Sequence, residues 1–241
     1  MKIVIIAPNV SENLSGEAIK AYQYAKALLA EGAEITLVTH ERSAGHLAHF
    51  PEAVEIIFVR DDFWQLLLWR SVLLRPLIDI PFFLHVRKIV RQMSLAASET
   101  VFHYLGPVSP ITPRFPVKAA NCVLGPITGN IYYPPALRAR EPFSLRWRRS
   151  LHGASQRVVG ALFNDKRGFR AILVSGGART RHSLKLAGAR DEQLRDVIDA
   201  GISETILKRP KITHEGENWR FVVNGRLTPH KGADLAIRAL A

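Results

Sequence analysis

Apolar residues follow two different periods along the start of the chain. Residues 2–6 form a nearly continuous apolar run, which is typical of a strand buried on both faces of a parallel sheet. After Gly16 the apolar side chains follow helical spacing from Ala18 to Leu29, with Ser15 as the expected N-cap and Gly32 at the end of the helix. Residues 34–39 are again strand-like, so this succession predicts a right-handed βαβ unit.

The same alternation continues as far as residue 201. The pattern predicts two helices within 62–92, broken near Pro76 or Pro81, and further helices within 136–168 and up to Leu186. Further strands are expected at 54–59, 100–105, 121–124, 170–174 and 197–201. We therefore expect an α/β fold over residues 1–210, a Rossmann-like parallel sheet with helices on both faces.

The last stretch of the chain predicts the beginning of a second domain. Residues 208–218 are polar, contain Pro210 and Gly216, and are the expected linker. An apolar run at 221–223 then precedes a turn with Gly225 and Pro229, and a helical pattern starts at Gly232. We therefore expect residues 219–241 to form a strand, a loop and a helix.

Composition narrows the class of protein. The chain has 241 residues, of which 47% are hydrophobic and 22% charged, as in ordinary soluble globular proteins. Met1 to Pro8 is expected to be a buried strand and not a signal peptide, and no run of about 18 apolar residues predicts a spanning helix. The single cysteine, Cys122, excludes an intrachain disulfide framework and agrees with a cytoplasmic location.

The net charge of +12 favours anionic partners, such as phosphorylated small molecules or acidic lipid surfaces. No zinc-ligand pairs or RNA-binding strand motifs are present, so we expect no nucleic-acid partner. Residues 62–92 and 136–168 combine Trp, Phe and Leu with many Arg and Lys. Two interpretations stay open for them: core-packing helices with solvated basic residues, or a surface that contacts an anionic membrane.

Ser15 and Gly16 are the first candidates for a binding site. They precede a predicted helix beyond the carboxyl end of the first strand, where open α/β sheets bind ligands. A plain turn glycine is the alternative. Gly16 has no second glycine two residues later, which argues against a dinucleotide fingerprint and a nicotinamide-dependent dehydrogenase.

His103 and the stretch that begins at Gly125 are the next candidates. His103 is expected near the carboxyl end of a strand, where loops build active sites, although a lone histidine is also often structural. Gly125, Thr128 and Gly129 belong to a stretch rich in glycine and proline that offers N–H and hydroxyl donors. This stretch would line a polar pocket or serve as an irregular connection.

Arg226 and Lys231 flank the turn at the start of the second predicted domain. A helix N-terminus with two flanking cations would suit the two phosphates of a nucleoside diphosphate. Glycine and basic residues are also common in the βα loops of any α/β protein, so this pattern alone leaves both interpretations open.

Taken in order, these motifs resemble those of the retaining glycosyltransferases with the two-domain GT-B architecture, called family 4 or group 1. The most specific match is Val223-Asn-Gly-Arg-Leu-Thr-Pro-His-Lys-Gly-Ala-Asp-Leu235, which resembles the first strand, loop and helix of the donor-binding domain. Ser15-Gly16 resembles the glycine loop that faces the cleft. Leu124-Gly-Pro-Ile-Thr-Gly129 resembles a Gly-Pro-Ile-Gly-Gly-Gly loop of one branch.

The resemblance implies transfer of a sugar from a nucleotide-diphosphate donor to a sugar, a lipid-linked sugar or another hydroxyl acceptor. It implies no metal, no further cofactor, His103 near the donor sugar, and Arg226 and Lys231 on the diphosphate leaving group. Thr128 and Asn130 depart from the loop glycines, and Tyr104 stands where many members carry a second histidine.

The family's paired glutamates of the donor site do not occur before Ala241. We therefore expect an acceptor-side domain with a truncated donor domain, inactive as residues 1–241. A second hypothesis is a non-catalytic, basic membrane-surface module. On either hypothesis we expect a cytoplasmic protein, and peripheral contact with the inner face of the membrane stays one of the two open interpretations of residues 62–92 and 136–168.

Overall fold

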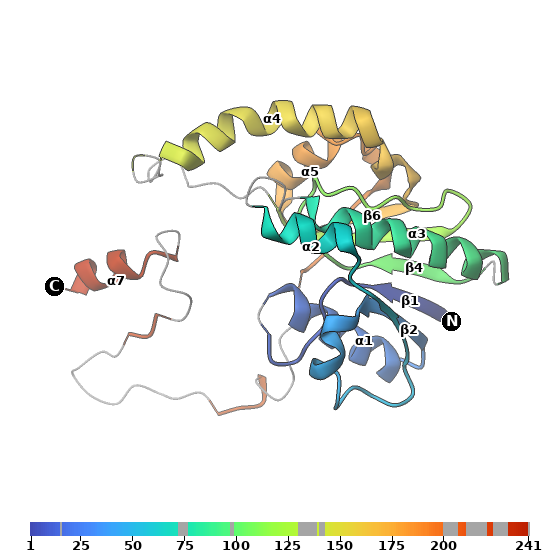
Figure 1. The fold of residues 1–241 in the computed structure, drawn as a ribbon. Coiled ribbons are helices and arrows are strands. Elements are labelled where there is room, and N and C mark those ends of the chain that lie inside the picture. The colour runs from blue at the N-terminus through green and yellow to red at the C-terminus, as the bar shows by residue number, and fades with distance from the viewer. Residues whose placement is uncertain are drawn as a thin grey trace. The chain divides into compact units, whose positions relative to one another are not determined.

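A computed structural model describes residues 1–14, 16–71, 77–96, 99–129, 139, 143–199, 207–210, 221–223 and 231–240 (Figure 1). The chain divides into two compact units. The first contains Met1–Ile131 and Pro142–Ala200, and the second contains the remainder.

The first unit is built on a seven-stranded sheet in the order β3-β2-β1-β4-β5-β6-β7. All neighbouring strands pair in parallel. This arrangement confirms the predicted α/β class with a Rossmann-like parallel sheet. The strands are β1 (Lys2–Ile6), β2 (Glu34–His40), β3 (Glu55–Val59), β4 (Val101–Tyr104), β5 (Asn121–Ile127), β6 (Ala171–Val174) and β7 (Leu194–Asp196).

Helices cover both faces of the sheet, as the sequence predicts (Figure 1). On one face, Ala21, Tyr22 and Ala25 of α1 (Glu17–Ala30) pack on Ile3 and Ile5 of the sheet. On the other face, α3 (Asp79–Ala96) and α5 (Gly177–Leu186) bury apolar side chains against the alternate strand residues. The residues of this second contact include Val4, Ile6, Phe82, Phe83, Phe102, Tyr104, Leu124 and Leu184.

The segments predicted as basic helices form α2 (Phe63–Arg70), α3 and α4 (Phe143–Phe163). Asp62 caps α2, because its side chain accepts a hydrogen bond from the backbone N–H of Gln65 at 2.8 Å. Pro81 lies in the first turn of α3, where a missing N–H costs nothing. Helix α4 lies so close to α5 that a Cβ on Gly160 would be 2.8 Å from the backbone oxygen of Leu186.

Three boundaries differ from the sequence expectation. Helix α1 begins at Glu17 with Gly16 at the N-cap position that the sequence pattern predicted for Ser15. Strand β5 continues past Leu124, because pairing with β6 resumes at Ile127 after a bulge. Strand β7 ends at Asp196, before the predicted 197–201, because its single buried anchor is Leu194 and its other two residues are exposed.

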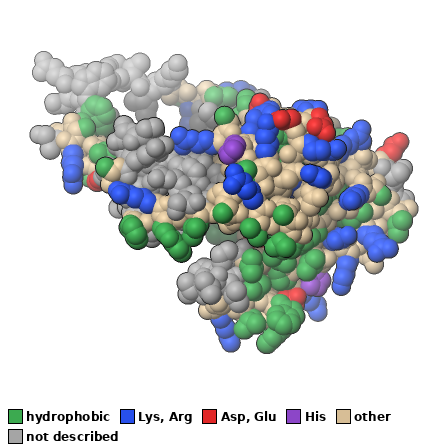
Figure 2. Space-filling view, turned by 90° about the horizontal axis from the view of Figure 1, so that it is seen from above, with side chains coloured by type: hydrophobic (Ala, Val, Ile, Leu, Met, Phe, Trp, Pro, Cys, Tyr) green, Lys and Arg blue, Asp and Glu red, His purple; other side chains and the backbone are tan. Residues whose placement is uncertain are grey.

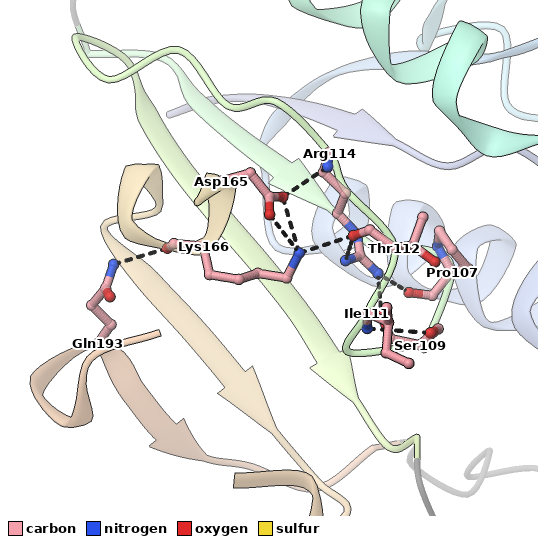
Figure 3. A network of polar contacts seen from close by, with 8 residues as sticks. All are labelled: Pro107, Ser109, Ile111, Thr112, Arg114, Asp165, Lys166 and Gln193. Atoms are coloured by element: carbon pink, nitrogen blue, oxygen red, sulfur yellow. Dashed lines mark hydrogen bonds and ion pairs between the residues drawn. The ribbon is translucent and has the colours of Figure 1, made fainter. Parts of the chain in front are cut away.

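No helix lies in the described connection between β4 and β5. Instead, the connection is held by Arg114, whose side chain is fully buried. The guanidinium donates to the backbone oxygens of Thr112 at 2.8 Å and Ser109 at 2.9 Å, and also to that of Pro107 (Figure 3). Burial lowers the pKa of Arg114 to about 10, so it stays charged at neutral pH.

Asp165 supplies the negative charge beside Arg114. Its carboxylate accepts from the Arg114 backbone N–H at 2.8 Å and from Lys166 Nζ at 2.9 Å (Figure 3). Lys166 is fully buried too, and burial lowers its pKa to about 8. It belongs to a 3-10 turn (Asp165–Gly168) that leads into β6, so this network joins both flanks of β5. Sequence patterning gave no sign of it.

The second unit contains α7 (Ala233–Leu240), which agrees with the helix expected after Gly232. Residues 221–223 form no strand, contrary to the sequence expectation, and their side chains are exposed. An apolar run becomes a strand only beside a partner strand, and the described part of this unit contains none.

Candidate functional site

The order of the strands reverses between β1 and β4. From β1 the chain moves to β2 on one side, and from β4 it moves to β5 on the other. The loops that leave the carboxyl ends of these two strands therefore diverge, and ligands of open α/β sheets bind in the crevice at such a switch point. The residues around this point form the candidate site, named here the switch-point crevice.

A row of hydrogen bonds crosses this edge of the sheet from α1 to α5. Glu17 Oε1 accepts from the backbone N–H of Val108 at 3.1 Å. The backbone oxygen of Val108 accepts from the N–H of Gly129 at 3.2 Å. The Gly129 oxygen then accepts from the hydroxyl of Thr180 at 2.7 Å. The loops after β4 and β5 are thus fixed to each other and to two helix N-termini.

Gly16 and Glu17 form the α1 side of the crevice. Gly16 has φ 71° and ψ −117°, a backbone conformation that favours glycine. No atom lies within 4 Å of the place where its Cβ would be. Across from it, Gly106 is close enough to Glu17 that an added Cβ would lie 3.6 Å from Glu17 Oε2. Gly16 is exposed, whereas Gly106 is buried beside the Glu17 carboxylate.

Lys20 lies one turn further along α1 and is buried. Its Nζ donates to Asp199 Oδ1 at 2.9 Å and to the backbone oxygen of Pro126 at 3.3 Å. It therefore connects α1 with the stretch that follows β7 and with the end of β5. Asp199 balances the lysine charge, so the pair fixes the wall of the crevice without adding net charge.

His103 is buried under α1 at the end of β4. Its Nε2 lies 2.8 Å from the backbone oxygen of Gly125, and its ring makes an edge contact with Tyr24 at 5.9 Å between centroids. Burial lowers the pKa of His103 to about 4, so the ring is neutral at pH 7. A carbonyl oxygen only accepts, so Nε2 carries the proton and Nδ1 does not.

Gly125 and Gly129 are required by packing. Gly125 has φ 111°, and an added Cβ would lie 2.4 Å from the backbone oxygen of Leu173. A Cβ on Gly129 would lie 2.4 Å from Pro110 Cδ. Thr128 between them is half-buried, and its hydroxyl forms no hydrogen bond with the described residues. In this stretch, Thr128 is therefore the candidate side chain for a hydrogen bond to a ligand.

The structure brings together Gly16, His103, Gly125, Thr128 and Gly129 from the sequence-predicted site residues, around the carboxyl ends of β1, β4 and β5. Ser15 and Arg226 lie outside the described residues. Lys231 belongs to the second unit and is exposed. Glu17, Lys20 and Asp199 were not among the site residues predicted from the sequence. Only Glu17 carried a signal, as an acidic residue directly after Gly16 in the first turn of a predicted helix.

The crevice offers polar groups without strong net charge. Glu17 keeps carboxylate lone pairs beyond the one that Val108 uses, and Thr128 supplies a hydroxyl that both donates and accepts. Within the described ranges, no three His, Cys, Asp or Glu side chains are grouped to hold a metal ion. Such a set of groups can bind a neutral ligand rich in hydroxyls.

A second surface feature lies on α4. Its exposed apolar side chains, at spacings of four and seven residues, share one side of the helix: Phe143, Trp147, Leu151, Val158 and Leu162. Helix α2 also exposes Phe63 and Trp64. Figure 2 shows one face of the molecule on which hydrophobic side chains lie among Lys and Arg, with fewer Asp and Glu. Within the described residues, every helix is too short or too polar to span a bilayer.

Comparisons with known proteins name no family. No protein-family model matches the chain, and a search of curated proteins finds no match. The class of the molecule therefore rests on its own fold: an α/β protein with a Rossmann-like parallel sheet and polar groups at the carboxyl edge beside the switch point.

Proposed function

We propose that this chain is the acceptor-side domain of a retaining GT-B glycosyltransferase. The reaction would move a sugar from a nucleotide-diphosphate donor to a hydroxyl acceptor, in the synthesis of a cell-surface, exopolysaccharide or lipid-linked glycan. The observation that carries the proposal is the row from Glu17 through Val108 and Gly129 to Thr180, which joins two loops and two helix N-termini at the switch point of a parallel sheet.

The chemistry of the crevice supports a sugar acceptor. A sugar hydroxyl both donates and accepts, and Glu17 and Thr128 offer an acceptor and a two-way partner for it. His103 is neutral, and its unprotonated Nδ1 can accept a hydrogen bond from a sugar hydroxyl. These groups bind through hydrogen bonds, which suits an acceptor without charge of its own.

The donor part of the proposal rests on the sequence resemblance. Arg226 and Lys231 would neutralise the charge that develops on the departing diphosphate, where fixed cations contribute most. The proposed donor site requires no metal, because these two cations take the role that a metal ion has in other transferases.

A titration with acceptor analogues tests this function. Hexyl glycosides of several sugars should bind at millimolar concentration or tighter, and 1,2-hexanediol should not. Thr128→Val removes the hydroxyl but keeps the shape, so it should weaken the best glycoside by about fivefold or more. Thr112→Val, which keeps the backbone oxygen that Arg114 uses, is the matched control. Equal affinity of diol and glycosides would contradict the proposal.

A second candidate function is attachment to an anionic membrane surface, favoured by the exposed apolar side chains of α4 and α2. Amphipathic helices with such a face and neighbouring cations bind in the headgroup region. The protein would then be cytoplasmic and peripheral at the inner face of the membrane, within reach of a lipid-linked acceptor. Trp64 fluorescence should shift to the blue on anionic vesicles, and no shift would remove the main support for attachment.

A further inference from the structure

A pocket of about 510 Å³ lies at the other end of the sheet, away from the switch-point crevice. It is open to solvent and is lined by the C-terminal half of α3, by residues 115–119 before β5, and by residues within 163–168 before β6. These segments all lie at the amino edge of the strands. The volume falls within the range of small-molecule sites, roughly 300–1,000 Å³. We name it the amino-edge pocket.

Three cations line the amino-edge pocket. Arg87 and Arg91 come from successive turns of α3, and Lys118 comes from the segment before β5. In the part of the chain that the structure describes, their charged groups form no ion pair or hydrogen bond. Three positive groups around one pocket repel each other, and a bound anion would attract all three and so offset this repulsion.

The carboxylate in the pocket wall, that of Asp165, already has hydrogen-bond donors and a cation as partners. Asp165 accepts hydrogen bonds from the backbone N–H of Arg114 and from Lys166 Nζ, at 2.8 and 2.9 Å. Lys166 is buried behind it and takes up its charge. Asp165 therefore leaves the positive charge of Arg87, Arg91 and Lys118 without a counter-ion.

Most of the remaining wall is apolar, and Ser94 and Asn164 are its polar side chains. Phe115 and Phe163 meet edge to face at 5.6 Å between ring centroids, and Leu95 is 85% exposed at the rim. An inorganic ion would leave these side chains in contact with water. A ligand with an apolar group would cover them, at a gain of roughly 25 cal/mol for each Å² removed from water.

We propose that the amino-edge pocket binds a phosphate group that carries an apolar chain, with the phosphate at Arg87, Arg91 and Lys118 and the chain against Phe115 and Phe163. Phosphates are favoured because arginine binds them with two parallel hydrogen bonds. This site lies apart from the proposed acceptor crevice and does not depend on the glycosyltransferase proposal.

Titration of the isotope-labelled chain with hexyl phosphate, followed by NMR, tests the site. Backbone amides at 117–119 and 163–168 should shift, with a millimolar or lower dissociation constant. Inorganic phosphate and 1-hexanol should each bind at least about tenfold more weakly, because each keeps one half of the ligand. Absence of shifts at 10 mM hexyl phosphate, or equal binding of either half, would overturn the proposal.

Charge reversal separates this site from general electrostatic attraction. Arg91→Glu and Lys118→Glu, which change exposed residues on two different walls, should each weaken hexyl phosphate by about tenfold or more. Lys88→Glu changes an exposed cation on α3 outside the pocket lining and should have less than about a threefold effect. Equal weakening by Lys88→Glu and Arg91→Glu would contradict a defined site.

Vesicles distinguish the two sources of such a ligand. Retention of the wild type, Arg91→Glu and Lys88→Glu is measured on vesicles of neutral lipid and on the same vesicles with added phosphatidic acid. Loss of retention in Arg91→Glu alone identifies a lipid headgroup as the ligand. If Arg91→Glu no longer binds hexyl phosphate but is retained on the vesicles as well as the wild type, the ligand is a small soluble alkyl phosphate.

Discussion

The carboxylate of Glu17 accepts a hydrogen bond from the backbone N–H of Val108 at 3.1 Å, and so joins the N-terminus of α1 to the loop after β4. These two residues lie on opposite sides of the point where the strand order reverses. A parallel sheet leaves the loops at this point diverging. The bond explains how both walls of the crevice hold a fixed separation.

Removal of the Glu17 carboxylate should loosen both walls. We expect Glu17→Ala to lower the free energy of unfolding by about 1–3 kcal/mol, because the Val108 N–H loses a charged acceptor. Glu17→Gln keeps an acceptor oxygen and should cost less. Urea unfolding measures both, with the exposed Glu52→Ala as the control, expected within about 0.5 kcal/mol of the wild type. A Glu17→Ala loss no larger than that of Glu52→Ala would contradict the role of the bond.

Gly125 should tolerate no side chain. We expect Gly125→Ala to destabilise by roughly 3 kcal/mol or more, because its Cβ would lie 2.4 Å from the Leu173 oxygen at φ 111°. Gly153→Ala is the opposite case, since nothing lies within 4 Å of its Cβ position in α4. It should stabilise by about 0.5–1 kcal/mol. Thermal unfolding checks the pair, and a mild Gly125→Ala would show that β5 and β6 separate more easily than described.

His103 should make the fold sensitive to acid. Its pKa is about 4 in the folded state because of burial, and near 6.5 when it is unfolded. Between these values the unfolded chain binds a proton that the folded chain does not. Neutral His103 therefore contributes its full stabilisation above pH 6.5. As the pH falls from 6.5 to 4, the free energy of unfolding decreases by up to about 3 kcal/mol.

The test of this prediction compares the stability at pH 7 with that at pH 5. His103→Gln keeps a donor for the Gly125 oxygen but does not titrate, so its loss of stability over this interval should be smaller than that of the wild type. His49→Gln changes an exposed histidine and is the control. His40, whose pKa burial lowers to about 4 as well, adds the same trend in every variant. Identical pH dependence in His103→Gln and wild type would refute this account of His103.

The exposed side chains of α4 should govern any binding to membranes. We expect the triple variant Leu151→Ser, Val158→Ser, Leu162→Ser to sediment with anionic vesicles about tenfold less than the wild type, because it loses the apolar face. All three positions are exposed, so the fold should be kept. Phe58→Ser on the edge strand β3 is the control. A control that loses as much binding as the triple variant would argue against a surface centred on α4.

The sheet could be predicted because short, nearly continuous apolar runs such as residues 2–6 are typical of strands buried on both faces. The same reasoning failed where polar side chains are buried. Arg114, Asp165 and Lys166 have the composition of a solvated loop, yet they form a closed network inside the protein. Nothing local in the sequence marks a pairing that joins a loop before β5 to a turn before β6.

The location of the candidate site could be predicted from the sequence better than the contacts between its residues. The glycines marked the loops at the carboxyl edge, because only certain positions require a missing side chain. Lys20 gave no signal, since its partner Asp199 is distant in the sequence and its burial depends on the tertiary fold. The phosphate role of Arg226 and Lys231 stays a prediction from the motif.

The most direct measurement of the central claim is an amide NMR map of the chain titrated with hexyl glycosides. If the switch-point crevice is an acceptor site, then Gly16, Glu17, Gly106 and Thr128 shift together with one dissociation constant. The amides of the amino-edge pocket should not move with these ligands. Glycoside binding that leaves these four amides unchanged, or no binding by any glycoside, would contradict the assignment of the crevice as the site of acceptor recognition.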